Sequence, residues 1–460
     1  MVDDYYQAVA IDLVTVICCV GLLLRFGGVR FAHPATPYMV FHLHTVTARL
    51  LGLMNGANRL FTHSAANFEP VAPFEIIRAS LYCDIAFWMV TIVWLVFRVN
   101  DRAPVRQDAM KLDPRILRPI LLVSFVGGII GLFVATQIPG IGTLAAVGGA
   151  SDVLTSSYVL ILPSWFGLAV LGYVYLRGYG RISTILVFVY LILMAIQASQ
   201  RFRVIIGLLL AIQIWVELNN RRWPSMALMV LLVVSAALFF PMKTIAKTIQ
   251  TGEEIDEAFT ATSDSITEVR QGAANDQMFL DEFGCGLTQL DIQGKLYWGE
   301  IYLPLVTLPI PRAIWPDKPT LASYLYDIST YARPMGPSGM IVTYLGEAYA
   351  NFGLYGIFIV PPIMAFILAL FYRAAILRPY DSVLRLAYTL LSVNLIQVYR
   401  DGLQSVVVFT FVNMMPLVVI VFAHVFVPFL SRRRPAGQAP SVFTGPSSVS
   451  RPDGAPAPNL

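Results

Sequence analysis

The chain has 460 residues, of which 57% are hydrophobic and 13% are charged, and its mean hydropathy is +0.67. A soluble domain of this composition would have too few polar side chains to cover its surface, so we exclude a soluble fold and predict an all-α polytopic membrane protein. The net charge of +4 does not by itself identify a binding partner. Because the chain is so apolar, we expect it to contact the lipid bilayer and not nucleic acid.

The predicted membrane spans follow from the length of the apolar runs. The acidic start, MVDDYYQ, lacks the basic flank of a cleavable secretory signal, so the first run is expected to remain as a span. A helix of about 20 residues crosses about 30 Å of hydrocarbon. The runs predict eleven spans, near residues 8–25, 36–54, 74–97, 119–137, 158–176, 182–199, 204–218, 223–241, 350–372, 384–399 and 405–428.

Basic residues in the short connections favour one orientation. They concentrate in loops on one side, including 98–118, 177–181 and 221–222, and this side is expected to be cytoplasmic. The other side carries the long segment 242–340, which has 13 acidic and 7 basic residues. We therefore predict that the N-terminus and this segment face outward and that the C-terminus is cytoplasmic.

Four regions follow from this orientation. We predict helices 1 to 8 over residues 1–241, an extracytoplasmic segment with amphipathic helices over 242–340, helices 9 to 11 over 341–430 and a disordered cytoplasmic tail over 431–460, which is rich in Pro, Gly, Ala and Ser.

The extracytoplasmic segment contains the proline-rich stretch LPIPRAIWPDKP, residues 308–319. Four prolines restrict the backbone, so Arg312, Asp317 and Lys318 are expected to project from a stiff strap that suits a binding site. The alternative is that the prolines simply end an interfacial helix and that the charges are solvated.

Further arginines lie at the predicted outer ends of helices, against the usual charge bias. Ionisable groups beside the hydrocarbon are costly and mark function or paired structural roles. With the strap they give five basic residues near Glu347: Arg201, Arg203, Arg312, Lys318 and Arg400. Arginine binds phosphate in a bidentate manner, so this cluster suits an anionic lipid head group such as a pyrophosphate. For each single arginine, a snorkelling helix end is the alternative.

Polar residues also lie inside the second predicted span, at His42, His44 and Arg49. Two residues on a helix are separated by about 200°, so the two histidines do not share a face for a metal. We interpret them as satisfied polar contacts within the helical bundle. We expect no bound metal and no cofactor, because the sequence has no phosphate-binding loop and no recognisable metal-ligand set.

Three stretches together resemble a known family. In chain order they are SQRFR, LYWGEIYLPLVTLPIPRAIWPDKP and TYLGEAYANFGLYG. They closely resemble the bacterial oligosaccharide repeat unit polymerases of the Wzy type, which build O-antigen and exopolysaccharide. The resemblance covers roughly residues 190–375, and IPRAIWPDKP followed by GEAYANFGLYG is its most specific part.

The resemblance implies a GT-C-like, metal-independent glycosyltransferase at the periplasmic face of the bacterial inner membrane, so the outward-facing N-terminus would be periplasmic. The enzyme would transfer a growing glycan from undecaprenyl pyrophosphate to a single lipid-linked repeat unit, and undecaprenyl pyrophosphate would leave. A chain-length regulator of polysaccharide synthesis is a further candidate partner.

This chemistry needs cations for the leaving pyrophosphate and a base for the acceptor hydroxyl. We therefore expect the five basic residues to bind the two pyrophosphates. Glu347 is the expected acceptor base, and Asp317 is the substitute candidate, for which a salt bridge with a neighbour is an equal alternative.

Two other functions compete with polymerisation. An O-antigen ligase-like transferase would generally use a histidine in the outer segment, and residues 242–340 contain none. A flippase or transporter for lipid-linked oligosaccharide would be expected to carry polar groups at mid-membrane depth, where only His42, His44 and Arg49 favour it.

Overall fold

The computed structural model describes most of the apolar runs and part of the segment 242–340. The described residues are 2–59, 61–63, 68–98, 114–137, 154–197, 201–219, 221–230, 279–307, 343–377 and 382–403, with single positions at Ile310, Trp315, Asp317, Met415 and Val418. They all belong to one compact unit, Met1–Val421. The predicted tail lies outside these residues, as do most of the proline-rich strap and most of the last predicted span.

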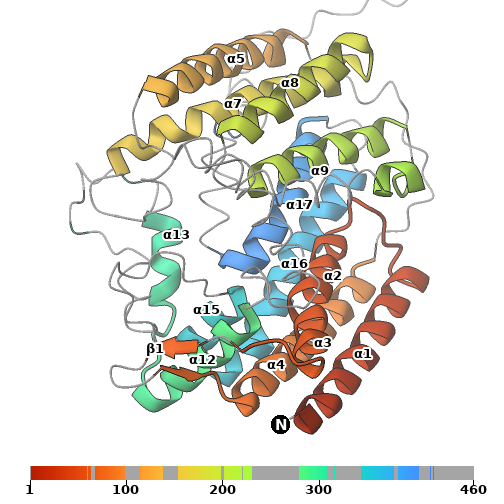
Figure 1. Cartoon of the computed structure of the whole chain (residues 1–460). Coiled ribbons are helices and arrows are strands. Elements are labelled where there is room, and N and C mark those ends of the chain that lie inside the picture. Colours follow the sequence, from red (N-terminus) through yellow and green to blue (C-terminus); the bar gives the residue numbers. More distant parts are fainter. Residues whose placement is uncertain are drawn as a thin grey trace, which may run out of the picture. The chain divides into compact units, whose positions relative to one another are not determined.

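In the first half of the chain, the described elements are helices and one hairpin, β1–β2 (Figure 1). Its elements are α1 (Val2–Arg25), α2 (Ala35–His42), the π-helix η1 (Leu43–Thr47), α3 (Ala48–Met54), β1 (Phe61–His63), β2 (Phe68–Pro70), α4 (Pro73–Val96), α5 (Pro114–Gln137), α7 (Leu154–Arg177), α8 (Arg181–Gln197) and α9 (Arg201–Leu218). The two strands pair in an antiparallel register, with Thr62 opposite Glu69.

In the second half, the described elements are several short helices, most of them within the segment 242–340, and two long helices. Its elements are α12 (Phe279–Gln293), the 3-10 helix η3 (Glu300–Tyr302), α13 (Leu303–Thr307), α15 (Tyr344–Phe352), α16 (Leu354–Leu377) and α17 (Ser382–Asp401). Within 253–283, where amphipathic helix was expected, the described part is the start of α12.

Nine of the eleven predicted spans coincide with helices, and the second one consists of α2, η1 and α3 in succession. Among the described residues, three helices are long and apolar enough to cross a membrane: Tyr5–Arg25, Pro73–Val96 and Leu354–Ala375. Shorter apolar helices lie within α5, α7, α8 and α9. The structure thus supports a polytopic helical membrane protein.

The exposed side of α16 is as apolar as its buried side. Tyr355, Ile359, Ile363 and Ile367 recur every four residues and are 48–76% exposed. An amphipathic helix of a soluble protein would have polar residues on this stripe. An exposed stripe of isoleucines therefore indicates a helix face in contact with lipid.

Two larger hydrophobic cores hold the helices together. One joins α1, α2, α3, α4, α12, α15 and α16 with the second half of α17, where Tyr399 is fully buried. The other joins α7, α8 and α9 with the middle of α17 through Leu390 and Val393. Helix α17 is therefore shared by both cores, as its place between the two groups of helices in Figure 1 shows.

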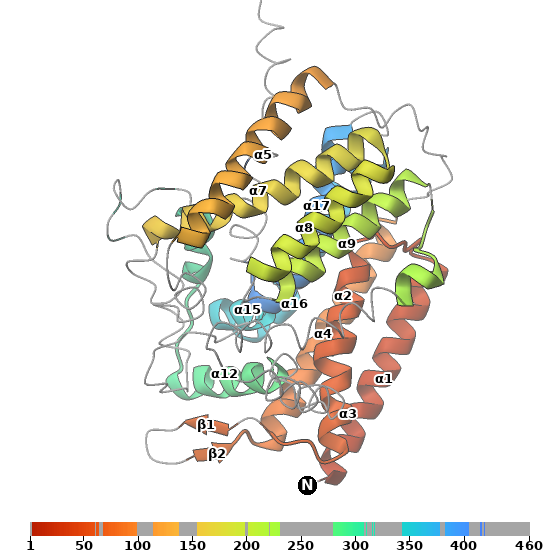
Figure 2. The same cartoon turned by 45° about the horizontal axis from the view of Figure 1, so that its top comes forward.

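At one end of the first core, α12 lies across the start of α4 (Figure 2). The two backbones approach closely at Gly284, where a Cβ atom would lie 2.7 Å from the Glu75 carbonyl oxygen. Arg49 of α3 binds α12 directly, with Nε 2.9 Å and Nη2 2.7 Å from the two Asp281 oxygens. We call this side of the bundle the α12 end.

The opposite end gathers several of the basic connections. The Phe31 backbone N–H donates to the Arg222 carbonyl oxygen at 2.9 Å, and the Tyr388 hydroxyl donates to the Ala32 carbonyl oxygen at 2.8 Å. The loop after α1, the loop after α9 and the start of α17 therefore lie together. Successive predicted spans run in opposite directions, and this arrangement also places these three segments at the same end.

The Arg49–Asp281 pair gives a first prediction, on stability. Both side chains are fully buried, so Arg49→Met leaves a buried carboxylate without its counter-ion and is expected to cost about 3–5 kcal/mol. The control is Arg78→Met: Arg78 pairs with Asp291, whose side chain is 44% exposed, and the expected loss is about 1 kcal/mol or less. Thermal unfolding of the purified protein in detergent measures both.

A double variant separates charge from packing. Arg49→Met combined with Asp281→Leu removes both charges, and it should recover much of the stability lost in Arg49→Met. Equal losses in Arg49→Met and Arg78→Met would contradict the structural importance of the buried pair.

Candidate functional site

Glu347 lies in the first turn of α15, in a fully buried position. Thr343 caps this helix, because its hydroxyl oxygen accepts a hydrogen bond from the Gly346 backbone N–H at 3.1 Å. A buried carboxylate requires polar partners, and the Glu347 Oε2 atom accepts a hydrogen bond from the Leu403 backbone N–H at 2.7 Å. The Glu347 carboxylate of α15 therefore binds the backbone of the segment that follows α17.

Gly402 makes this close approach possible. Its φ of +89° lies in the left-handed region, and a Cβ atom there would clash with the Glu347 carboxylate. A glycine meets both requirements at once, because it tolerates positive φ and has no side chain. The turn after α17 is thus built around the Glu347 carboxylate.

Two charged residues directly precede this turn. The Arg400 guanidinium lies over the Phe279 ring of α12, 4.8 Å from its centre, and its Nε atom is 3.3 Å from an Asp401 oxygen. Gln397 also donates a hydrogen bond to Asp401. The Arg400 side chain is 16% exposed, so its guanidinium group, carried two residues before Gly402, still reaches the surface.

Asn351 fixes a second turn beside Glu347. Its Oδ1 atom accepts hydrogen bonds from the backbone N–H groups of Gly299 and Ile301, at 2.8 and 3.3 Å, and its amide donates to the Glu347 carbonyl oxygen at 2.9 Å. The following residue, Tyr302, has its pKa raised by burial and then by the Glu347 carboxylate. Tyr302 therefore remains a neutral phenol at physiological pH.

A third contact joins α4, α12 and α15. Asp291 accepts a hydrogen bond from the Tyr349 hydroxyl at 2.6 Å and pairs with the Arg78 guanidinium at 2.5 Å. Burial raises the pKa of Tyr349, and the Asp291 carboxylate raises it further. Glu347 and Tyr349, two residues apart on α15, thus bind the turn after α17 and Asp291 of α12 respectively, and together they hold α15 against its neighbours.

The predicted site residues fall into three groups. Glu347 and Arg400 lie on elements that meet at the α12 end. Asp317 is an exposed turn residue. Arg201 and Arg203 form the start of α9, but their side chains lie outside the described part, as do Arg312 and Lys318 entirely. The proposed role of each of these residues stays a prediction.

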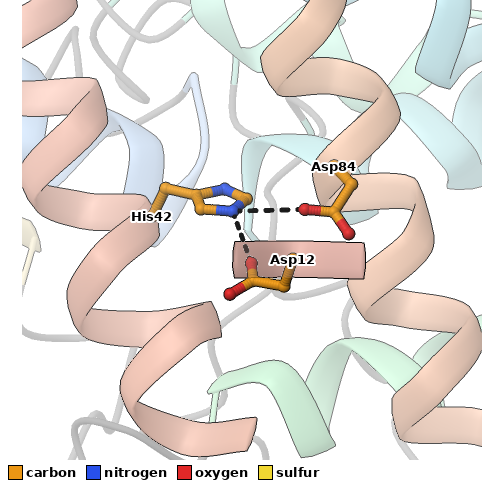
Figure 3. Close-up of side chains that lie close together, drawn as sticks. All are labelled: Asp12, His42 and Asp84. Atoms are coloured by element: carbon orange, nitrogen blue, oxygen red, sulfur yellow. Dashed lines mark hydrogen bonds and ion pairs between the residues drawn. The ribbon is translucent and has the colours of Figure 1, made fainter. Parts of the chain in front are cut away.

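A second polar cluster lies inside the helical bundle, and the sequence alone did not indicate that its members meet. The Nε2 atom of His42 is 2.9 Å from an Asp12 oxygen and 3.4 Å from an Asp84 oxygen (Figure 3). His42 comes from α2, Asp12 from α1 and Asp84 from α4, and all three are buried. A single aspartate in an apolar span signals such a site, but only the fold reveals its partner. His44 is exposed, whereas His42 is buried, so the two histidines do not share a face.

The chemical capacities of the α12 end are those of its ionisable groups. A carboxylate can accept a proton, and a partly exposed guanidinium can bind an anion. Comparisons of this chain with protein-family models, with curated proteins and with solved structures find no match.

Gly402 gives a second prediction. Gly402→Ala should lower stability by more than Gly178→Ala, although both glycines have positive φ, +89° and +77°. Each substitution costs about 1–2 kcal/mol of backbone strain, but at Gly178 a Cβ atom meets nothing within 4 Å, whereas at Gly402 it displaces the Glu347 carboxylate. Thermal unfolding in detergent compares the two variants, and equal losses would contradict the close packing of Glu347 against the turn.

Proposed function

We propose that this chain polymerises lipid-linked oligosaccharide repeat units into a bacterial surface glycan such as O-antigen or exopolysaccharide. In this function the α12 end faces the periplasm and the end with the basic loops faces the cytoplasm of the inner membrane. The proposal rests on the resemblance of residues 190–375 to repeat unit polymerases. It is supported by one contact: the Glu347 carboxylate of α15 accepts a hydrogen bond from the Leu403 backbone N–H, just after the end of α17.

The proposed reaction is a glycosyl transfer of the GT-C kind, without metal or cofactor. The acceptor hydroxyl of the lipid-linked unit attacks the anomeric carbon of the growing chain and gives its proton to Glu347. The bond from that carbon to undecaprenyl pyrophosphate breaks, and the lipid leaves with the bonding electron pair as a pyrophosphate anion. Arg400, with Arg201, Arg203, Arg312 and Lys318, would balance the developing negative charge.

The burial of Glu347 adds a requirement to this mechanism. Its carboxylate is covered by Gly402 and Leu403, so the turn after α17 must move before an acceptor hydroxyl can reach it. Such a movement would carry Arg400 and Asp401 with it, since both directly precede the turn. Acceptor binding and the arrangement of the cations would therefore be coupled.

A transporter for lipid-linked oligosaccharide is the second candidate function. The observation that favours it is the buried Asp12–His42–Asp84 cluster, which lies inside the apolar helices where a transporter would carry polar groups. A transporter would move single repeat units and would not lengthen them, so the length of the glycan separates the two candidates. A ligase-like transferase would instead attach a finished glycan to another acceptor.

The site gives a third prediction, on glycan length. In a host that lacks its own polymerase but contains the matching repeat unit pathway, Glu347→Gln should abolish long glycan and leave single units on the lipid carrier. Glutamine can still accept the Leu403 N–H hydrogen bond, so it preserves the turn while removing the base. The readout is the glycan ladder on a gel, with membrane levels of the protein measured in parallel.

Two further variants serve as comparisons. Glu300→Gln changes an exposed carboxylate of the same segment and should keep the wild-type ladder. Arg312→Ala should abolish long glycan as Glu347→Gln does. If Glu347→Gln and Arg312→Ala both keep wild-type lengths, the proposed site is wrong, and if Asp317→Asn alone abolishes them, the base is Asp317.

A further inference from the structure

We propose that Asp12, His42 and Asp84 form a binding site for a divalent transition-metal ion of the zinc class. The ion would link α1, α2 and α4 in the interior of the helical bundle. The site is separate from the residues proposed for glycosyl transfer, and its role would be structural.

The three side chains lie well inside the apolar helices. Asp12 belongs to the candidate span Tyr5–Arg25 and Asp84 to the candidate span Pro73–Val96. The three residues are 0%, 2% and 4% exposed, for Asp12, His42 and Asp84 respectively. Charged groups in such a place are expensive unless their charge is balanced.

The ligand atoms converge on one point. One atom from each residue lies within 4.8 Å of the other two, and the His42 Nε2 atom is 2.9 Å from an Asp12 oxygen and 3.4 Å from an Asp84 oxygen. A tetrahedral zinc ion with bonds of about 2.0–2.2 Å holds its ligand atoms roughly 3.3 Å apart. Figure 3 shows the His42 Nε2 atom directed between the two carboxylates, so small side-chain rotations would complete the set.

Hydrogen bonding within the protein does not satisfy this cluster. The Nε2 atom carries at most one proton, yet it faces two carboxylates. In the described part of the chain, Asp12 Oδ2 and both Asp84 oxygens are buried and have no hydrogen-bond partner. Buried polar atoms are normally paired, and a bound cation would give both buried carboxylates the partner that their hydrogen bonds do not supply.

Charge balance and ligand type favour a transition-metal dication. Two carboxylates carry two negative charges, and one divalent ion with a neutral imidazole makes the site neutral. Imidazole nitrogen is a ligand for zinc and its neighbours, whereas calcium and magnesium prefer oxygen alone. The π-helix η1 begins at the residue after His42, and such helices are common at functional sites.

The experiment measures metal bound to the whole purified protein. The chain is purified in detergent, exposed to Zn²⁺ alone and washed, and its metal content is determined by mass spectrometry. We expect about one zinc ion per chain in the wild type. We also expect a lower thermal unfolding temperature after treatment with a chelator, restored by Zn²⁺. Replacement by Co²⁺ should give visible absorption bands of a low-symmetry nitrogen and oxygen site.

Matched variants identify the ligands. Asp84→Asn and His42→Gln should lose the bound zinc and the response to chelator. Glu217→Gln changes a carboxylate on α9 that accepts a hydrogen bond from Thr389 at 2.8 Å, outside the cluster, and should keep both. Because the chelator test uses unaltered protein, the proposal remains testable even if a variant fails to fold.

Two results would overturn the proposal. One is a wild type without bound zinc whose unfolding temperature does not respond to chelator, in which case protons shared between the two aspartates neutralise the cluster. The other is adventitious binding only, with the same zinc content in wild type, Asp84→Asn and His42→Gln. Neither result would bear on the proposed glycosyl transfer.

Discussion

The buried ion pair between Arg49 and Asp281 is the interaction on which the α12 end depends. It joins a helix of the apolar bundle to the segment that follows the large undescribed stretch, over a sequence separation of 232 residues. Its desolvation is costly, and the bidentate geometry, with a further hydrogen bond from Arg49 to the Asn58 carbonyl oxygen at 2.7 Å, offsets that cost. The pair fixes α12 in position and orientation against α3.

The other contacts at this end follow from the position of α12. Phe279 at its start provides the ring beneath Arg400, and Asp291 near its end holds Tyr349 of α15. Helix α15 carries Glu347, whose carboxylate holds the turn after α17. A movement of α12 would therefore reach both the cation and the carboxylate of the candidate site, which gives the segment 242–340 a direct influence on the proposed chemistry.

Much of the fold was predictable from the sequence, because the bilayer sets the length of an apolar run. The predicted span 74–97, for example, corresponds to α4, Pro73–Val96. The sequence also indicated Glu347 and Arg400 at the same end of the helices. Their link through Gly402 and Leu403 was not predictable, since it depends on the backbone of a turn. Asp12 and Asp84 were missed because each is a single acidic residue in an apolar run, and only helix packing brings both to His42.

The most direct test of the proposed function is reconstitution of the purified chain in liposomes with a synthetic undecaprenyl-pyrophosphate-linked repeat unit of its own glycan. Since the proposed reaction takes its energy from the lipid pyrophosphate bond, the account predicts a ladder of products that differ by one repeat unit, formed without nucleotide sugar. Repeat units that remain single, whether or not they cross the bilayer, would contradict it.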